Sequence, residues 1–298
     1  MPLSSSMHEG ALKELRRINL PLEIPVHPFL FDHCFDGKVI LPAAAMLQHL
    51  AAALCSQAPP AQAQHMTKAS FDHFLHIDFC PPCIEATNEL IFYENGSISS
   101  ALLTVGKMKS GITRAKKHAS VCFPAAAPQP VALAADRDAL PAENSFTLSS
   151  HRLYAELVPF GPAFQTVQGD VLLFEKGARA LVYAPEYSGA SGPLGSLFPF
   201  DGALHAACAW SQRFCGIVAF PVRFDERVIV KPIAPGETAL CRIIPVSLHE
   251  GVVRFDVLLY DLKGEHREKV KGLAMKDISG GRMTPPAWIR SDSSPWPV

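Results

Sequence analysis

Residues 42–56 read PAAAMLQHLAAALCS, and this run of alanine and leucine predicts a helix that is buried on most of its sides. Proline suits the first turn of such a helix, because its missing N–H would have no helical partner there. Four segments with strand character follow, at residues 69–79, 84–93, 97–107 and 114–123. Asn95-Gly96 between the second and the third is a strong hairpin signal. This half of the chain therefore reads as antiparallel strands wrapped around one buried helix.

The second half of the chain repeats that order. A hairpin is predicted over residues 163–184, and a glycine-rich loop at 188–196 leads to a second apolar helix at 201–214. Four strands follow, near residues 220–230, 238–248, 252–261 and 268–277. Helices do not alternate with strands, as they would in a doubly wound sheet. We predict an α+β protein with a double hotdog fold, in which two antiparallel sheets each wrap a buried central helix.

The proline- and alanine-rich stretch between the halves predicts a linker. The predicted organisation is an N-terminal extension (1–19), an N-terminal hotdog (20–124), the linker (125–147), a C-terminal hotdog (148–278) and an irregular tail rich in glycine, proline and serine (279–298).

Composition excludes several classes of protein. The chain has 298 residues, 48% of them hydrophobic and 18% charged, which favours a large core over disorder. The 27 basic and 28 acidic side chains give a net charge of -1, so no global field attracts nucleic acid or anionic lipid. No apolar run approaches the ~20 residues that span a bilayer, and the charged start lacks the pattern of a secretory signal. We expect a cytoplasmic protein that binds neither nucleic acid nor membrane.

The loop before the first helix holds the first candidate for chemistry. It contains His33-x-x-x-Gly37-x-x-x-x-Pro42, which places His33 close to the electropositive end of that helix. Gly37 allows the backbone to turn or to approach a ligand closely.

The second half offers two further stretches. Asp201 falls at the predicted start of the second apolar helix, and His205 lies one turn later on the same face. An ordinary helix N-cap is the alternative for Asp201, and a packed histidine is the alternative for His205. Phe160-Gly161-Pro162-Ala163-Phe164 precedes the second hairpin, and a turn entering a strand would explain it.

Taken together, these stretches resemble the dehydratase domains of polyketide synthases and of related fatty-acid synthases. That family has H-x-x-x-G-x-x-x-x-P in its first hotdog, then Y-G-P-x-F, then D-x-x-x-Q/H at its second helix, which is the order found here. The resemblance covers roughly residues 20 to 278. The chain departs from the pattern at Ala43, where the family has glycine, at Phe160, where it has tyrosine, and at Pro199, which lies closer to the aspartate than the family's proline.

The resemblance implies a lyase that removes water from a 3-hydroxyacyl thioester, with His33 as base and Asp201 as acid. A histidine with an ordinary pKa near ~6.5 is largely neutral at pH 7 and can remove the C2 proton. A carboxyl can protonate the departing hydroxyl only if its surroundings keep it protonated, and the apolar flanks of Asp201 favour that. We expect His205 to orient Asp201, and the backbone near Gly37 and Pro42 to stabilise the thioester oxygen.

The resemblance also implies the partners. The substrate would be carried on the phosphopantetheine of an acyl carrier protein, other synthase domains are possible neighbours, and the chain needs no cofactor or metal of its own. Phe160, Gly161 and Pro162 would support the site. No phosphate-binding glycine loop, nucleophile elbow or zinc spacing supports another enzyme class.

Three alternatives remain open at this point: a double-bond isomerase, a cyclase like the product-template domains, and a non-catalytic acyl-binding module. The chain could be a monomer or a homodimer.

Overall fold

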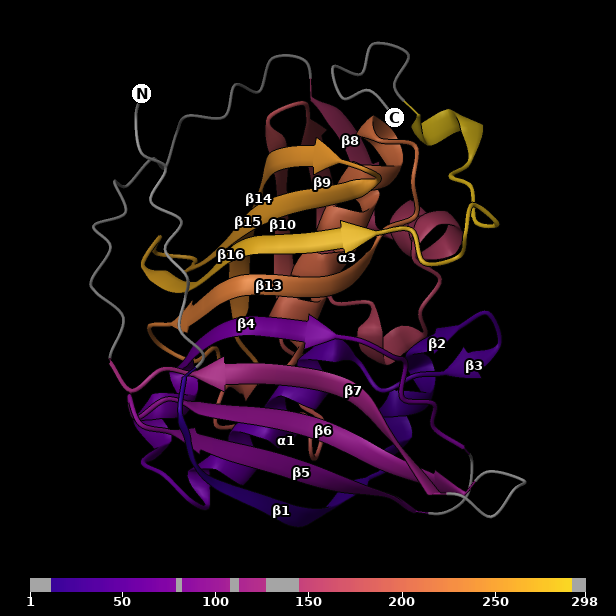
Figure 1. Ribbon diagram of the computed structural model, residues 1–298. Helices are drawn as coiled ribbons and strands as arrows, with labels where there is room; N and C mark the ends of the chain where they lie inside the picture. The colour runs from indigo at the N-terminus through magenta and orange to yellow at the C-terminus, as the bar shows by residue number, and fades with distance from the viewer. Residues whose placement is uncertain (1–11, 79–81, 108–112, 127–144, 291–298) are drawn as a thin grey trace, which may run out of the picture.

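The computed structural model describes residues 12–78, 82–107, 113–126 and 145–290 (Figure 1). Within these ranges, twelve strands form one antiparallel sheet. In order across the sheet they are β1 (Glu14–Pro25), β5 (Cys83–Tyr93), β6 (Ile98–Lys107), β7 (Thr113–Phe123), β4 (His65–Phe71), β13 (Phe220–Ile229), β16 (His266–Lys276), β15 (Val252–Asp261), β14 (Thr238–His249), β10 (Gly177–Tyr183), β9 (Val167–Phe174) and β8 (Phe146–Ser149). The first five strands belong to the N-terminal half, and the other seven belong to the C-terminal half.

The two halves meet where β4 pairs with β13. Met66 lies opposite Arg227 in this antiparallel ladder, and Ser70 lies opposite Arg223. At the end of the ladder, Nε2 of His65 lies 2.9 Å from Oε1 of Glu226. The double hotdog prediction is confirmed, and the two predicted sheets are joined edge to edge.

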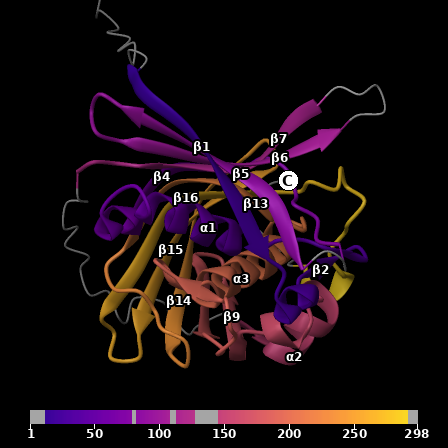
Figure 2. The ribbon, with the colours of Figure 1, turned by 90° about the horizontal axis from the view of Figure 1, so that it is seen from below.

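The two long helices lie side by side within the curve of the sheet, as the view from below shows (Figure 2). Helix α1 (Ala43–Cys55) belongs to the first half and α3 (Phe198–Phe214) to the second. Every residue of α3 except Arg213 is buried. Gly202 allows the sheet to approach α3 closely, because a Cβ there would lie 2.6 Å from Oγ1 of Thr166.

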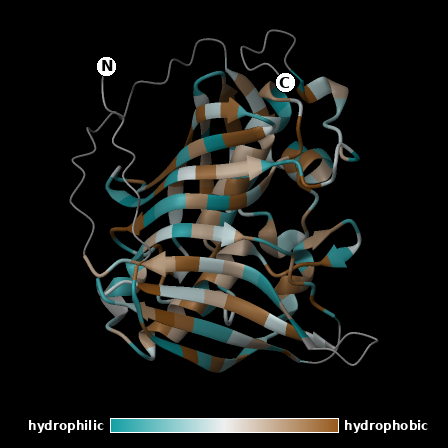
Figure 3. Cartoon of the chain, in the orientation of Figure 1, coloured by the Kyte–Doolittle hydropathy of each residue, from teal (hydrophilic) through white to brown (hydrophobic). Residues whose placement is uncertain are grey.

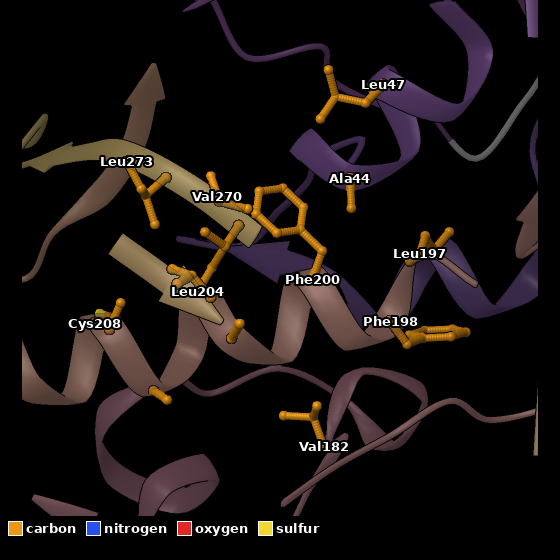
Figure 4. Close-up of a cluster of buried hydrophobic side chains, with 14 of the residues drawn as sticks. Ala44, Leu47, Val182, Leu197, Phe198, Phe200, Leu204, Cys208, Val270 and Leu273 are labelled. Carbon is orange, nitrogen blue, oxygen red and sulfur yellow. The ribbon is translucent and has the colours of Figure 1, made fainter. Parts of the chain in front are cut away.

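Hydrophobic and hydrophilic residues alternate along most strands, so each strand turns one apolar face toward the helices (Figure 3). Side chains from both helices and from the sheet meet in one core cluster. Figure 4 shows part of it, with Ala44 and Leu47 from α1, Phe198, Phe200, Leu204 and Cys208 from α3, and Val270 and Leu273 from β16.

Strand β1 corrects the prediction for the N-terminus. It begins at Glu14 and pairs with β5, so it crosses the predicted boundary between the N-terminal extension (1–19) and the N-terminal hotdog (20–124). Its apolar side chains alternate in the manner of a strand, but Pro21 and Pro25 obscured the pattern. Proline is tolerated because β1 is the edge strand of the sheet.

Several other boundaries differ from the prediction. Strand β4 ends at Phe71, and the residues that follow form a loop that pairs with the segment after His33 through the bridge between Ile40 and His76. Helix α3 begins three residues earlier than predicted, at Phe198. Most of the predicted linker lies outside the described residues. A segment for which no separate elements were predicted forms β8, a short helical turn α2 (Ser150–Arg152) and a helical turn η3 (Leu153–Leu157).

The described part of the predicted irregular tail packs against the second half. It contains one short turn, η5 (Ala287–Ile289), and the side chain of Ile289 is fully buried. Among the described residues, there is no helix both long enough and apolar enough to cross a membrane.

We expect Leu47→Ala to lower the free energy of unfolding by about 2–5 kcal/mol, because it leaves a cavity among α1, α3 and the sheet. Leu47 is fully buried, whereas Leu262 is 69% exposed in a turn. Leu262→Ala is therefore the matched control and should change stability by less than about 0.5 kcal/mol. Urea denaturation of both variants checks this, and equal losses would contradict the core described above.

Candidate active site

His33 lies between the short helical turn η1 (Pro28–Asp32) and β2 (Cys34–Phe35). Its ring is fixed by Nδ1, which lies 2.8 Å from the carbonyl oxygen of Ile40. The backbone of the same two residues is also bonded, since the N–H of Ile40 donates to the carbonyl of His33 over 3.1 Å. A carbonyl can only accept, so Nδ1 carries the proton and Nε2 keeps a free lone pair.

The turn that follows His33 explains Gly37. Strand β2 pairs with β3 (Lys38–Val39), and the two residues between them, Asp36 and Gly37, have φ values of 50° and 70°. Two consecutive positive φ values are the requirement of a type I′ hairpin turn, for which Asp-Gly is a favoured pair. A Cβ at Gly37 would meet none of the described atoms within 4 Å. Gly37 therefore shapes the hairpin, and it does not line the cavity described below.

Pro42 is the N-cap residue of α1, one position before the place predicted for it in the first turn. Its carbonyl accepts the N–H of Met46 over 3.0 Å. Among the described residues, no side chain caps this end of the helix. The next residue, Ala43, lines the same cavity as His33, which is described below.

Asp201 lies inside the first turn of α3 and does not cap it, because the N-cap residue is Leu197. The N–H of Asp201 already donates to the carbonyl of Leu197 over 3.2 Å. Asp201 is 2% exposed and His205, one turn later, is 3% exposed. The N-cap alternative for Asp201 is therefore wrong.

The side chains of Asp201 and His205 are close together. Nε2 of His205 lies 3.0 Å from Oδ2 of Asp201, within the range of an ion pair. The angles do not meet those of a hydrogen bond, so both atoms are buried without a hydrogen-bond partner among the described residues. Buried polar atoms of this kind are costly in a structural core and are typical of sites that meet a ligand.

His33 from the first half and Asp201 from the second line one cavity of about 650 Å³, together with His205 and Phe160. The two groups are close, because Asp201 contributes to the pKa of His33. Much of the remaining wall is apolar and includes Phe35, Ile40, Met46, Phe74, Leu157, Leu204, Cys208, Val218 and Met275. Gly161 and Pro162 do not line the cavity.

Phe160 stacks on the imidazole of His33. The two ring centroids are 4.3 Å apart, with an angle of 29° between the planes, and the centroid of His205 lies 5.2 Å from that of Phe160. Phe160 therefore contacts both histidines of the cavity.

Asp32 holds Phe160 in this place by clamping the turn that follows it. The carbonyl of Asp32 accepts the N–H of Gly161 over 2.8 Å, and its carboxylate accepts the N–H of Ala163 over 2.8 Å. A Cβ at Gly161 would lie 2.5 Å from this carboxylate, so glycine is required. Pro162 begins the short turn η4 (Pro162–Phe164). Gly161 and Pro162 thus support the site indirectly, and Asp32 has a structural role that no motif of the sequence indicated.

Burial lowers the pKa of His33 below its ordinary value of 6.5. The neighbouring Asp201 and the bond to Ile40 act in the opposite direction, but each is a smaller effect than burial. The imidazole is therefore neutral near pH 7, as a general base requires.

Tyr154 in η3 was not among the predicted site residues. Its hydroxyl oxygen lies 3.2 Å from Nδ1 of His205, on the opposite side of the ring from Asp201. No motif of the sequence marks this tyrosine, since its position depends on how η3 packs against α3.

We expect Phe160→Ala to raise the pKa of His33 toward 6.5, because water then reaches the ring and the desolvation that lowers this pKa is reduced. An NMR titration of the His33 ring proton, assigned with His33→Gln, measures the shift. Phe74→Ala is the matched control: Phe74 lines the same cavity but its ring packs against Phe35 and Phe220. A pKa of His33 that is unchanged in Phe160→Ala would show that this ring does not shield the imidazole.

A comparison of the sequence with protein-family models gave no match, and neither did a search of curated protein sequences. Solved structures with a similar fold do exist. The dehydratase domain of a mycocerosic acid synthase-like polyketide synthase is 18% identical, with a TM-score of 0.69 over 90% of this chain and 94% of that one. The dehydratase domain of PpsC from Mycobacterium tuberculosis is 22% identical, with a TM-score of 0.64 over 87% and 93%.

A trans-AT polyketide synthase dehydratase domain from Brevibacillus brevis is 19% identical, with a TM-score of 0.69 over 88% of this chain and 93% of that one. Identities at this level establish the architecture. The chain has the double hotdog fold of polyketide synthase dehydratase domains.

Proposed function

We propose that this protein is a dehydratase that converts a 3-hydroxyacyl thioester into a 2-enoyl thioester. One observation carries the proposal: a neutral imidazole from the first half and a buried carboxyl from the second half line the same largely apolar cavity. These two groups are the base and the acid that the reaction needs, and they stand at the positions where the family motifs place them.

The proposed reaction begins at His33. Nε2 is free to act, because Nδ1 is engaged by the carbonyl of Ile40. Nε2 takes a proton from C2 of the substrate, and the electrons of the C2–H bond form the C2–C3 double bond. The C3–O bond breaks, and the proton of the Asp201 carboxyl goes to the departing hydroxyl, which leaves as water. His33 is then protonated and Asp201 is ionised. A proton passes from His33 to Asp201 through solvent, which restores both groups for the next cycle.

The start of α1 is suited to stabilise the thioester oxygen as negative charge grows on it. The first N–H groups of a helix have no partner within the helix, and the helix dipole makes this end electropositive. Ala43 lies in the cavity wall beside His33, so the first turn borders the place where C2 would react. Alanine in place of the family's glycine adds one methyl group to this wall.

We propose that the acyl group arrives on the phosphopantetheine of an acyl carrier protein and that other synthase domains are neighbours. The similarity to domains of polyketide synthases supports this. The PpsC dehydratase domain was solved in complex with C12:1-CoA, so a domain of this fold accepts a long acyl chain attached to CoA. The apolar side chains of Leu204, Cys208 and Val218 in the cavity wall are suited to such a chain in this protein.

Phe160 favours one alternative, an acyl-binding module without turnover, because the hydroxyl of the family's tyrosine is missing from the cavity. Isomerisation or cyclisation on the same fold would use the same pair of residues. A product assay separates these possibilities, since only dehydration converts a 3-hydroxyacyl thioester into the enoyl product with loss of water.

We expect the protein to dehydrate a 3-hydroxyacyl thioester of CoA or N-acetylcysteamine, with kcat/KM falling at least about 100-fold in His33→Ala and in Asp201→Asn. Mass spectrometry of the enoyl product measures the rate. His249→Ala and Asp170→Asn, both on the surface and away from the cavity, are controls that should stay within about twofold. Binding of the thioester without product in the wild-type protein would support the acyl-binding module instead.

The activity should persist as the pH falls below 6.5. Burial lowers the pKa of His33, so the imidazole stays neutral to a lower pH than an ordinary histidine. The acidic limb of kcat/KM against pH should therefore lie below 6.5, and it should move upward in Phe160→Ala. An acidic limb at or above 6.5 in the wild-type enzyme would rule out a desolvated His33 as the base.

A further inference from the structure

The hydroxyl of Tyr154 is buried beside the proposed acid and has no part in the reaction described above. Tyr154 itself is buried, and its ring meets that of His205 edge to face, with centroids 5.7 Å apart. Its oxygen lies 2.9 Å from the backbone nitrogen of Val167 and 3.2 Å from Nδ1 of His205. Thr166 and Asp201 are also close enough to affect the pKa of this hydroxyl.

Donor and acceptor roles at Tyr154 follow from its neighbours. The N–H of Val167 can only donate, so the phenol oxygen accepts that bond. Of the remaining neighbours, Nδ1 of His205 lies within hydrogen-bond distance, whereas Oγ1 of Thr166 has no hydrogen-bond partner among the described residues, so the phenol proton is directed to Nδ1. Burial raises the pKa of Tyr154 well above its ordinary value of 10, so the hydroxyl keeps its proton.

An accepting Nδ1 decides the tautomer of His205. A neutral imidazole carries one proton, which must then reside on Nε2. Nε2 is the nitrogen that lies 3.0 Å from Oδ2 of Asp201. The angles at this contact do not meet those of a hydrogen bond, and catalytic hydrogen bonds are often poorly aligned before substrate binds.

We propose that Tyr154 is a positioning residue that holds His205 as its Nε2–H tautomer and so directs the transferable proton of Asp201 to the oxygen that faces the substrate. With Oδ2 accepting from His205, the proton of the carboxyl resides on Oδ1. In the other tautomer, Nε2 would accept the proton of Asp201, and the acid would point at His205 instead of at the leaving hydroxyl. The catalytic consequence rests on the proposed dehydratase function, but the tautomer does not.

The first test is the tautomer itself, read from the ¹⁵N chemical shifts of the His205 ring in the full chain at neutral pH, with the signal assigned by His205→Gln. The wild-type protein should show the Nε2–H form, and Tyr154→Phe should lose that preference. Tyr187→Phe is the control, because Tyr187 is 40% exposed and packs on Phe29. An Nδ1–H form in the wild-type protein, or an unchanged tautomer in Tyr154→Phe, would overturn the proposal.

The second test is a double-mutant cycle on dehydration. Tyr154→Phe should lower kcat roughly tenfold and leave KM within about twofold, because substrate binding is unaffected while the proton is misdirected. In the His205→Gln background, the same change should alter kcat by less than about twofold, since there is no tautomer left to control. Equal losses in both backgrounds would assign Tyr154 to the support of the fold.

The two hypotheses fail separately. If the wild-type protein gives no enoyl product while Tyr154→Phe changes the tautomer, the dehydratase function is wrong and the control of His205 stands. If dehydration is observed and the tautomer does not respond, the control of His205 is wrong. Circular dichroism verifies that each variant is folded, and because Tyr154→Phe leaves the N–H of Val167 without its acceptor, a modest loss of stability is expected in either case.

Discussion

The ladder between β4 and β13 is the constraint on which the rest of the structure depends. Each half has its own helix and its own strands, but neither half has a complete site. The backbone pairing of Met66 with Arg227 and of Ser70 with Arg223 fixes the distance between the halves. Asp32 adds a second connection close to the chemistry, since it accepts two N–H groups from the turn of Gly161 to Ala163. Together they bring His33 and Asp201 to one cavity.

The two functional groups are supported in different ways. His33 is held in a short loop by one carbonyl bond and by the ring of Phe160, so a few contacts fix both its tautomer and its neutral state. Asp201 lies in a helix that is buried almost throughout, and His205 and Tyr154 are arranged behind it. The state of the proposed base therefore depends mainly on the exclusion of water from its ring. The orientation of the proposed acid depends on a series of polar neighbours within the core.

The sequence was most informative where composition alone determines the structure. The two apolar helices were predicted to within three residues. A helix that is buried on all sides has apolar residues on every face, so its sequence indicates burial whichever elements it packs against. The four strands that follow the second helix were also found close to their true bounds. Strand β1 was missed because prolines mask an edge strand, and β4 was extended too far because the alternation continues through residues 72–78 into a loop.

Other features could not be predicted from single residues. The pairing of His33 with Asp201 came from the order of three motifs and not from either residue alone, and both line one cavity in the structure. Asp32 contacts Ala163, 131 residues further along the chain, and Tyr154 contacts His205, 51 residues further along. The sequence around Asp32 or Tyr154 does not predict either contact. Gly37 and Gly161 were correctly singled out as special positions, but a positive φ explains the first and a neighbouring carboxylate explains the second.

The ladder between β4 and β13 has a consequence for synthesis of the chain. His65 and Glu226, which meet at its end, are 161 residues apart, so this ladder closes only after most of the polypeptide has left the ribosome. Until then the first half exposes the unpaired edge of β4 and the apolar residues that α3 will cover. Such an edge is a template for pairing with other chains. The edge of β4 is therefore open to pairing with other chains until β13 has been made.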